Sequence, residues 1–471
     1  MSDLASSTSE GMALDATASL SHSISRWSKK GIHEQPATVI IPEKEQDILA
    51  AVEYARENAL QVLPAGGGHG SFIDIGSKTL YLDMKLFNQI EVNEGAQTAR
   101  VGGGAVTGEL IKALTDKGFY TTWTNSNAVG VVGSILGGGN PTMGGMHGMM
   151  IDQVLSVRLI TADGRIVEVS SSSTGDELAL FHAICGAGLG LGVIISLDMK
   201  IFPIENLRLS MGCAWVRKLI FAARDIEFAA NVFDRLQPPT SKTTMSLVFA
   251  RAPPTAPNPG AAMIILTVTY YGPSDEAEAA VPILFEKDIV NKAIVAQTAP
   301  TPLATLNNAL AHFDVHGGFK DIQSAAMSKV SVQSTLFAFY KWLHFTTQYE
   351  DATRTTMVLS SFNPEKQTEI SKTQEGKARY FDHRERGFQA LIISWSETRS
   401  TERAATDFAK EIKTVYRQGS VASEPPRTLV NNMAPDTKLE EFFPEEKVEE
   451  LKRLVGIWDP TGLFWRPWAE R

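Results

Sequence analysis

The chain has 471 residues, with 44 lysines and arginines against 53 aspartates and glutamates, and a formal net charge of −9. This acidic balance argues against a nucleic-acid-binding protein, because such proteins present a basic face to the phosphates. Its two cysteines exclude a disulfide framework and a four-thiolate zinc site. No secretory signal is visible and no apolar run reaches the ~18 residues of a membrane helix, so we expect a cytoplasmic protein that does not enter membranes.

Short strands and helices alternate in the first 205 residues. Apolar side chains recur at helical spacing in some segments, whereas β-branched residues fill short runs between turn residues in others. The sequence Ala162-Asp163-Gly164 is a strong turn signal between two strands. The expected elements are strands at 38–41, 80–84 and 192–202, helices at 43–60, 106–117 and 176–184, and hairpins at 90–101 and 155–169.

After residue 206 the glycine clusters end and longer elements begin. Strands are expected at 245–250, 261–271, 355–360 and 388–396, and helices at 274–287 and 401–417. Long strands interleaved with helices indicate an α+β fold in which an antiparallel sheet is covered on one face. These changes divide the chain into a tail at 1–33, a first domain segment at 34–205, an inserted domain at 206–420 and a final segment at 421–471.

Glycines cluster at 66–70, 102–104, 137–145 and 186–192. Backbone amides in glycine-rich turns can surround an anion such as a pyrophosphate, because no Cβ keeps the ligand away. Tight turns and close strand packing explain the second cluster better, but a bound dinucleotide explains the other three better. The Rossmann and Walker patterns both fail, since Leu191 takes the place of a required glycine in the first and Ser71 does so in the second.

Five motifs occur in the order found in a known flavoenzyme family. Residues 64–71 (PAGGGHGS) resemble the R-x-G-G-H loop of FAD-linked oxidoreductases of the vanillyl-alcohol oxidase superfamily, in the berberine-bridge-enzyme-like branch. Residues 129–139, 186–194, 429–432 and 458–464 are similar to that branch's V-G-V-x-G-x-x-L-G-G-G, G-G-G-G-N-F-G-V-V, Y-x-N and D-P-x-x-x-F segments. The resemblance implies a two-part PCMH-type FAD-binding domain, formed by the segments before and after an inserted substrate domain.

The resemblance also assigns cofactor contacts. His69 stands where the family attaches the flavin covalently, although Ala65 replaces the family's arginine. Ser126 stands where many members carry a second, cysteinyl attachment, so the FAD is expected to be bound through His69 only. The other contacts implied are Gly66, Gly67, Gly68, Gly70, Ser71, Val129, Gly130, Gly133, Ser134, Gly138, Gly139, His147, Gly148, Ile194 and Asn431.

The catalytic base is less clearly marked. Asn432 occupies a position where many members have a tyrosine that supports proton removal. Tyr349 and His383 are the alternatives that the inserted domain offers. Further candidates there are Glu350, Arg384 and the pair His312 and His316, whose spacing alone does not predict a metal site.

The resemblance implies an oxidase that transfers a hydride from a small organic substrate to flavin N5, with O₂ re-oxidising the flavin. The absence of a second flavin attachment favours a polyketide- or alkaloid-like specialised metabolite over an oligosaccharide. Two other hypotheses remain: the protein is a redox-neutral cyclase that uses FAD as a scaffold, or it is a binding protein that keeps only the fold. The sequence predicts no oligomeric state.

Overall fold

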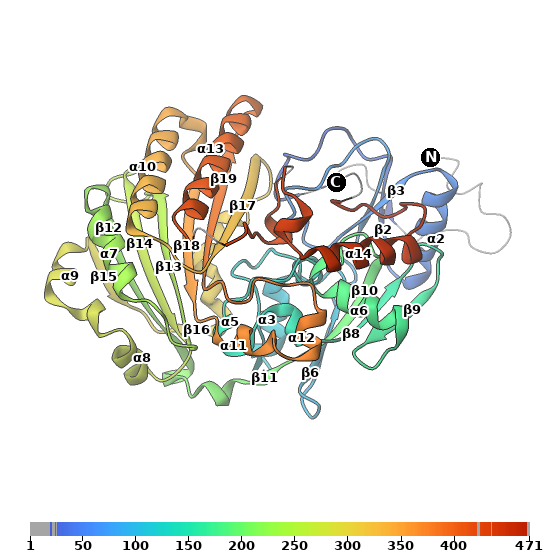
Figure 1. Cartoon of the computed structure of the whole chain (residues 1–471), viewed down its shortest axis with the longest axis horizontal. Coiled ribbons are helices and arrows are strands. Elements are labelled where there is room, and N and C mark those ends of the chain that lie inside the picture. Colours follow the sequence, from blue (N-terminus) through green and yellow to red (C-terminus); the bar gives the residue numbers. More distant parts are fainter. Residues whose placement is uncertain (1–18, 21–23, 25, 422–423, 435, 469–471) are drawn as a thin grey trace.

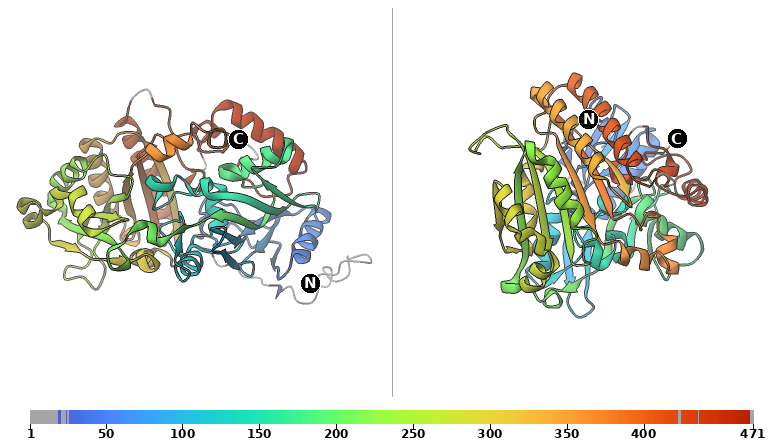
Figure 2. Two further views of the ribbon diagram at one scale, coloured as in Figure 1. Left: turned by 90° about the horizontal axis from the view of Figure 1, so that it is seen from below. Right: turned by 60° about the vertical axis from the view of Figure 1, so that its left-hand side comes forward.

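The computed structural model describes residues 19–20, 24, 26–421, 424–434 and 436–468. Two smaller sheets lie on one side of the molecule and one large sheet on the other, as Figure 1 and both views of Figure 2 show. Among the described residues, no helix combines the length and the hydropathy that crossing a bilayer requires.

The first region contains a four-stranded and a five-stranded sheet. In the first sheet β2, β4 and β3 run parallel, whereas the second is antiparallel with the order β5-β6-β10-β8-β9. The two expected hairpins are confirmed as β5–β6 and β8–β9. The strands are β1 (Ser19–Leu20), β2 (Thr38–Ile41), β3 (Gln61–Ala65), β4 (Thr79–Asp83), β5 (Ile90–Asn93), β6 (Thr98–Gly102), β7 (Phe119–Tyr120), β8 (Val154–Ile160), β9 (Ile166–Ser170), β10 (Val193–Lys200) and β11 (Phe202–Pro203).

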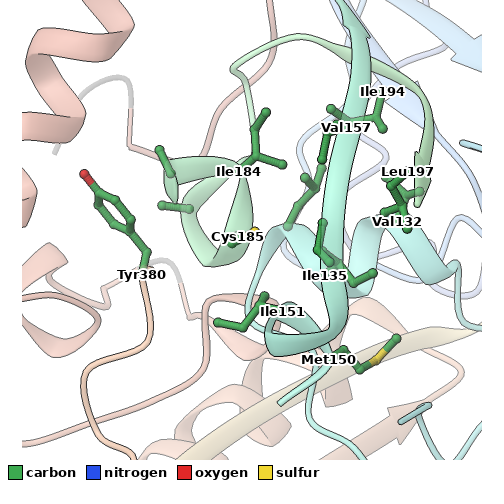
Figure 3. Packing of buried hydrophobic residues seen from close by; sticks show 14 of the residues in the cluster. Val132, Ile135, Met150, Ile151, Val157, Ile184, Cys185, Ile194, Leu197 and Tyr380 are labelled. Atoms are coloured by element: carbon green, nitrogen blue, oxygen red, sulfur yellow. The ribbon is translucent and has the colours of Figure 1, made fainter. Parts of the chain in front are cut away.

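Helices of this region pack on the antiparallel sheet. Ile184 and Cys185 lie against Ile135 and against Val157 of the sheet, with Tyr380 on their other side (Figure 3). All these side chains are buried, so this cluster is the core of the region. The helices are α2 (Glu45–Glu57), α3 (Thr107–Thr115), α4 (Val131–Leu136), α5 (Gly144–His147) and α6 (Gly175–Ala187).

The C-terminal segment returns to the first region. Helix α14 (Glu445–Trp458) packs on α6, and the chain then pairs with β3. The Val62 amide donates to the Leu463 carbonyl at 2.8 Å, and the Trp465 amide donates to the Val62 carbonyl at 2.9 Å. Segments far apart in the sequence therefore share one structural unit.

The second region is built on an eight-stranded antiparallel sheet. Its main order is β15-β12-β14-β13-β18-β19-β17, and β16 pairs with β12. Side chains alternate along each strand, so one face packs under helices while the other faces the first region. The strands are β12 (Cys213–Ala222), β13 (Thr243–Arg251), β14 (Ala262–Tyr270), β15 (Val295–Thr298), β16 (Thr301–Pro302), β17 (Phe319–Met327), β18 (Thr356–Phe362) and β19 (Phe388–Ser396).

Three of the helices of this region cover the outer face of the sheet. In α13 (Arg399–Gln418) the apolar residues Ala405, Phe408 and Ile412 form one buried stripe, as the sequence predicted. The helix begins where the Thr398 hydroxyl accepts a hydrogen bond from the Thr401 amide. Helices α7 and α10 pack beside one another, and α10 also packs on α13. The other helices are α7 (Ile226–Arg235), α8 (Ser274–Ala280), α9 (Lys287–Lys292), α10 (Val332–Gln348), α11 (Glu365–Ile370) and α12 (Gln374–Ala378).

The predicted α+β fold class is confirmed, but two expectations differ from the structure. The single helix expected at 274–287 is broken near Pro282, because proline disfavours helical backbone in the residue before it. The expected tail is also too long. Arg26, Trp27 and Ser28 are buried, and the Trp27 amide donates to the Gly68 carbonyl at 3.2 Å.

Candidate active site

A cavity of about 810 Å³ lies between the glycine-rich loops of the first region and the bare face of the large sheet. It has the size of a site for a small organic ligand or part of a cofactor. Among the described residues that line it, none is an aspartate or a glutamate. Its titratable residues are Arg26, His69, Lys218, Tyr271 and His312.

Two glycine loops meet at one end of this cavity. A Cβ on Gly67 would lie 2.4 Å from the Ala128 carbonyl oxygen and 2.6 Å from the Gly130 nitrogen, so only glycine allows this approach. A Cβ on Gly133, by contrast, would meet no atom within 4 Å. Within the described chain, the amides of residues 67–71 donate no hydrogen bond to another protein group. Free amides beside an open, glycine-lined space fit an anionic dinucleotide such as FAD.

His69 follows this loop and lines the cavity. Its ring stacks on Trp27 with 4.3 Å between centroids and 17° between planes. Burial is the main cause that lowers the pKa of His69 to about 3, and the nearby Lys320 cation adds to the effect. The imidazole is therefore neutral at physiological pH, which is the nucleophilic form.

Most of the predicted cofactor residues line the same cavity. Ser126 does so while its hydroxyl donates to Asp314 Oδ1 at 2.6 Å. Asn431 also lines it, and its side-chain amide donates to the Gly133 carbonyl at 3.1 Å. Asn432 lines the cavity too, and so does His312, one of the further base candidates. The others brought together there are Gly66, Gly67, Gly68, Gly70, Ser71, Val129, Gly130, Gly133, Ser134 and Ile194.

Several predicted residues lie elsewhere. His147 does not line the cavity; its Nε2 hydrogen-bonds the Tyr120 hydroxyl at 3.0 Å and its ring stacks on Phe202. Burial lowers the pKa of His147 to about 4. Gly138, Gly139 and Gly148 have left-handed φ angles of 105°, 65° and 84°, so they shape the turns behind the cavity without lining it.

The two base candidates from the inserted domain are also away from the cavity. Tyr349 follows α10 on the helix-covered side of the sheet, where it packs on Phe345. His383 is buried against Phe381, and burial lowers the pKa of His383 to about 3. Neither residue lines the cavity, so neither can reach a ligand there without rearrangement.

The sequence of this chain is similar to those of known FAD-binding proteins. Residues 36–170 match the model of an FAD-binding domain family. The chain is 28% identical over 432 residues to FAD-linked oxidoreductase OXR1 of Pyricularia oryzae, covering 90% of this chain and 82% of that protein. It is 24% identical over 449 residues to FAD-linked oxidoreductase hasG of Aspergillus fumigatus, covering 93% and 92%.

Solved structures share the fold over nearly the whole chain. Physcomitrella patens BBE-like 1 superposes with a TM-score of 0.76 at 18% identity, covering 96% of each chain. An Acremonium strictum glucooligosaccharide oxidase does so with a TM-score of 0.76 at 16% identity, covering 95% of this chain. The chain therefore contains an FAD-binding domain and is similar to FAD-linked oxidoreductases over about nine-tenths of its length, and it shares its fold with berberine-bridge-enzyme-like proteins.

Sequence reasoning missed several residues that line the cavity of this oxidoreductase. Trp27 and Arg26 come from the expected tail, where no periodicity marks them, yet Arg26 Nη2 donates to the Gly70 carbonyl at 2.6 Å. Tyr271 follows β14 and is 3% exposed. Burial raises the pKa of Tyr271 to about 12, so the phenol keeps its proton at neutral pH. The alternation of β14 could have indicated that Tyr271 shares a face with Thr267 and Thr269.

Proposed function

We propose that this oxidoreductase is an oxidase of small organic, specialised-metabolite substrates of polyketide- or alkaloid-like type. The observation that supports the proposal is one cavity shared by the glycine loops and the sheet face, because FAD held on the loops would lie beside a substrate held on the sheet. Bound FAD would supply hydride acceptance at its N5 atom and re-oxidation by O₂. The fungal relatives named FAD-linked oxidoreductases agree with the redox class.

The residues of the chain take distinct roles in this proposal. The free amides of residues 67–71 would hold the FAD pyrophosphate, and the neutral His69 would attach the flavin. Trp27 would fix the orientation of the His69 ring by stacking on it. The protonated Tyr271 phenol would donate a hydrogen bond to a substrate oxygen rather than accept a proton.

A proton leaving the substrate has few acceptors in the cavity. Asn432 is not a base, and the described lining contains no carboxylate. His312 lines the cavity, and partial desolvation of its ring together with the nearby Arg354 cation lowers its pKa, so its imidazole is a neutral proton acceptor at neutral pH. We therefore assign proton acceptance to His312, directly or through water.

The test is turnover of pathway intermediates by the purified holoenzyme. Aerobic conversion should release hydrogen peroxide in proportion to product, and anaerobic mixing should bleach the flavin absorbance. Oligosaccharides such as cellobiose, added as a separate arm, should cause no bleaching. Bleaching by oligosaccharides alone would replace the proposed substrate class.

A redox-neutral cyclase is a second candidate. The observation in its favour is Asn432, which places no proton acceptor where the family has its tyrosine. Such an enzyme would consume its substrate without oxygen while the flavin stays oxidised. Anaerobic product formation with unchanged flavin absorbance would therefore favour the cyclase and exclude the oxidase.

A further inference from the structure

Polar side chains form a row across the cavity face of the large sheet. Lys218 of β12 is paired in register with Gln297 of β15 on one side and with Thr267 of β14 on the other. The row continues because Thr267 pairs with Ser246 of β13, which pairs with Ser360 of β18. Residues directly opposite in antiparallel strands project to the same face, and all five line the cavity.

None of these five side chains has a partner within the part of the chain that the structure describes. They make no side-chain hydrogen bond, and Lys218 forms no ion pair. Other cavity residues are engaged, for example Thr244, whose hydroxyl donates to the Thr142 carbonyl. A row of five free polar groups on a cavity wall is suited to a ligand, because water or a ligand must satisfy them.

The next row of the sheet is apolar. Val248 pairs with Ile265 and with Val358, and Val358 pairs with Leu391. These four side chains line the cavity directly beside the polar row. The cavity face of the sheet therefore has a polar row beside an apolar row. This arrangement suits a flat molecule with oxygen substituents along one edge.

This cavity face of the sheet carries a positive charge. Lys218 is its cation, and no carboxylate lines the cavity among the described residues. An ammonium substrate would meet an unpaired positive charge, whereas an anionic group would gain a charge-assisted hydrogen bond. Lys218 is also remote from the attachment loop. Trp27 stacks on His69, and its carbonyl accepts a hydrogen bond from Lys320 of β17. Strand β17 lies five strand positions from β12, the strand of Lys218, and this corresponds to about 24 Å across the sheet.

We propose that Lys218 anchors an acidic group of the substrate, a carboxylate or an ionised phenol or enol, at the β12 end of the cavity. The free hydroxyls of Thr267, Ser246 and Ser360 hold further oxygens of the same molecule. The three strand spacings from Lys218 to Ser360 correspond to about 14 Å, the length of a molecule with two or three fused rings. The inference rests on the proposed function, since it names the substrate class of the same cavity.

The test uses holoenzyme and a matched pair of probes, 6-hydroxy-2-naphthoate and its uncharged analogue 6-hydroxy-2-naphthamide, titrated by calorimetry. The wild type should bind the acid more tightly than the amide. Lys218→Met should weaken the acid by about 10- to 100-fold and leave the amide unchanged, since a hydrogen bond to a charged group is lost. Lys218→Arg should restore most of the preference for the acid, and Lys287→Met, an exposed charge loss on α9, should change neither affinity.

Three outcomes would overturn the inference: equal binding of both probes, binding of neither by the wild type, or an unchanged acid affinity in Lys218→Met. Flavin content is measured in every variant, and loss of FAD in Lys218→Met would assign the lysine to the cofactor instead. Peroxide release and flavin bleaching by substrates are recorded separately. A protein that prefers the acid but never reduces its flavin would refute the oxidase and leave the anion site standing.

Discussion

His69 shows how neighbours set the chemistry of one residue. Its ring is held between the glycine loop and Trp27, and Lys320 lies 4.9 Å from the Trp27 ring centroid. Lys320 is itself buried, with its ammonium bonded to the Trp27 carbonyl at 2.9 Å. Burial is the main cause that lowers the pKa of His69, and this nearby cation adds to it, so the imidazole stays neutral and able to act as a nucleophile.

The first prediction concerns covalent attachment through His69. Acid-precipitated wild-type protein should keep its yellow colour, and one tryptic peptide containing His69 should carry the mass of FAD. His69→Ala should release all of its flavin on denaturation, because Ser126 offers a hydroxyl bonded to Asp314 and no thiolate. Mass spectrometry of both proteins makes the check. Complete release of flavin from the wild type would disprove the attachment without disproving FAD binding.

The second prediction concerns pH. The folded-state pKa of His69 is about 3 and its ordinary value is 6.5, so the folded protein keeps the neutral ring where a free histidine would be protonated. Attachment of added FAD to the apoprotein should therefore proceed at a similar rate from pH 8 down to pH 5. Acid-stable flavin is measured over time, with non-covalent FAD binding at each pH as the control. A rate that falls about 25-fold between pH 7 and pH 5 would show an ordinary pKa.

The same shift affects folding stability in a definite direction. Because the folded pKa is depressed, the unfolded chain binds a proton at His69 between pH 6.5 and about 3 while the folded chain does not. The contribution of His69 to stability is therefore present above pH 6.5 and is lost as the pH falls toward 3.

Among the elements, the glycine loop after β3 sets the shape of the cofactor end. We predict that Gly67→Ala abolishes FAD binding, since its Cβ would overlap the Ala128 carbonyl and the Gly130 nitrogen, both of them backbone atoms. Gly76→Ala is the matched control, because its Cβ would meet nothing within 4 Å. Flavin per protein, read from absorbance, should be near zero in the first variant and unchanged in the second. Normal flavin in Gly67→Ala would mean that the two loops can separate.

The elements that the sequence predicted best were those with local signals. The β8–β9 hairpin has an Asp-Gly turn, and α13 has a clear apolar stripe, so short-range patterns were sufficient. Strand β17 was not predicted, because Lys320 and Asp321 interrupt its apolar pattern. Both side chains are buried, and their charged groups are satisfied by residues far away in the sequence. Lys320 needs the Trp27 carbonyl, and Asp321 is paired with Lys30.

The candidate site was predictable in part for the same reason. The motifs predicted loops that would hold FAD, which are continuous in sequence, and most of their residues line the cavity. The proposed substrate face was not predictable, since Lys218, Thr267 and Ser360 come together only through the register of the large sheet. The base candidates Tyr349 and His383 were wrongly expected near the ligand, because residue type alone does not tell whether the segment that carries a side chain reaches the cavity.

At the scale of the whole molecule, the active-site cavity exists only while the two regions stay together. Buried polar contacts join them at several places, because the first region meets segments that flank the large sheet. Arg384, which precedes β19, donates to both carboxylate oxygens of Asp152 in the first region, at 2.7 and 2.8 Å. The side chains of this pair are 2% and 5% exposed, so water screens the two charges very little.

The last prediction therefore concerns this buried pair. Asp152→Asn keeps the size of the side chain but leaves the Arg384 guanidinium buried without a counter-charge, which should cost about 3 kcal/mol or more of stability. The Tm of the holoenzyme should fall by several degrees, and FAD should be lost at lower urea concentration, because separation of the regions opens the cavity. Asp176→Asn removes an equivalent but exposed contact with Arg453, whose side chains are 52% and 45% exposed, and should leave both values almost unchanged. If the two variants lost Tm equally, the Asp152–Arg384 pair would not be what holds the regions together, and the packing of apolar side chains around Phe381 would have to account for it.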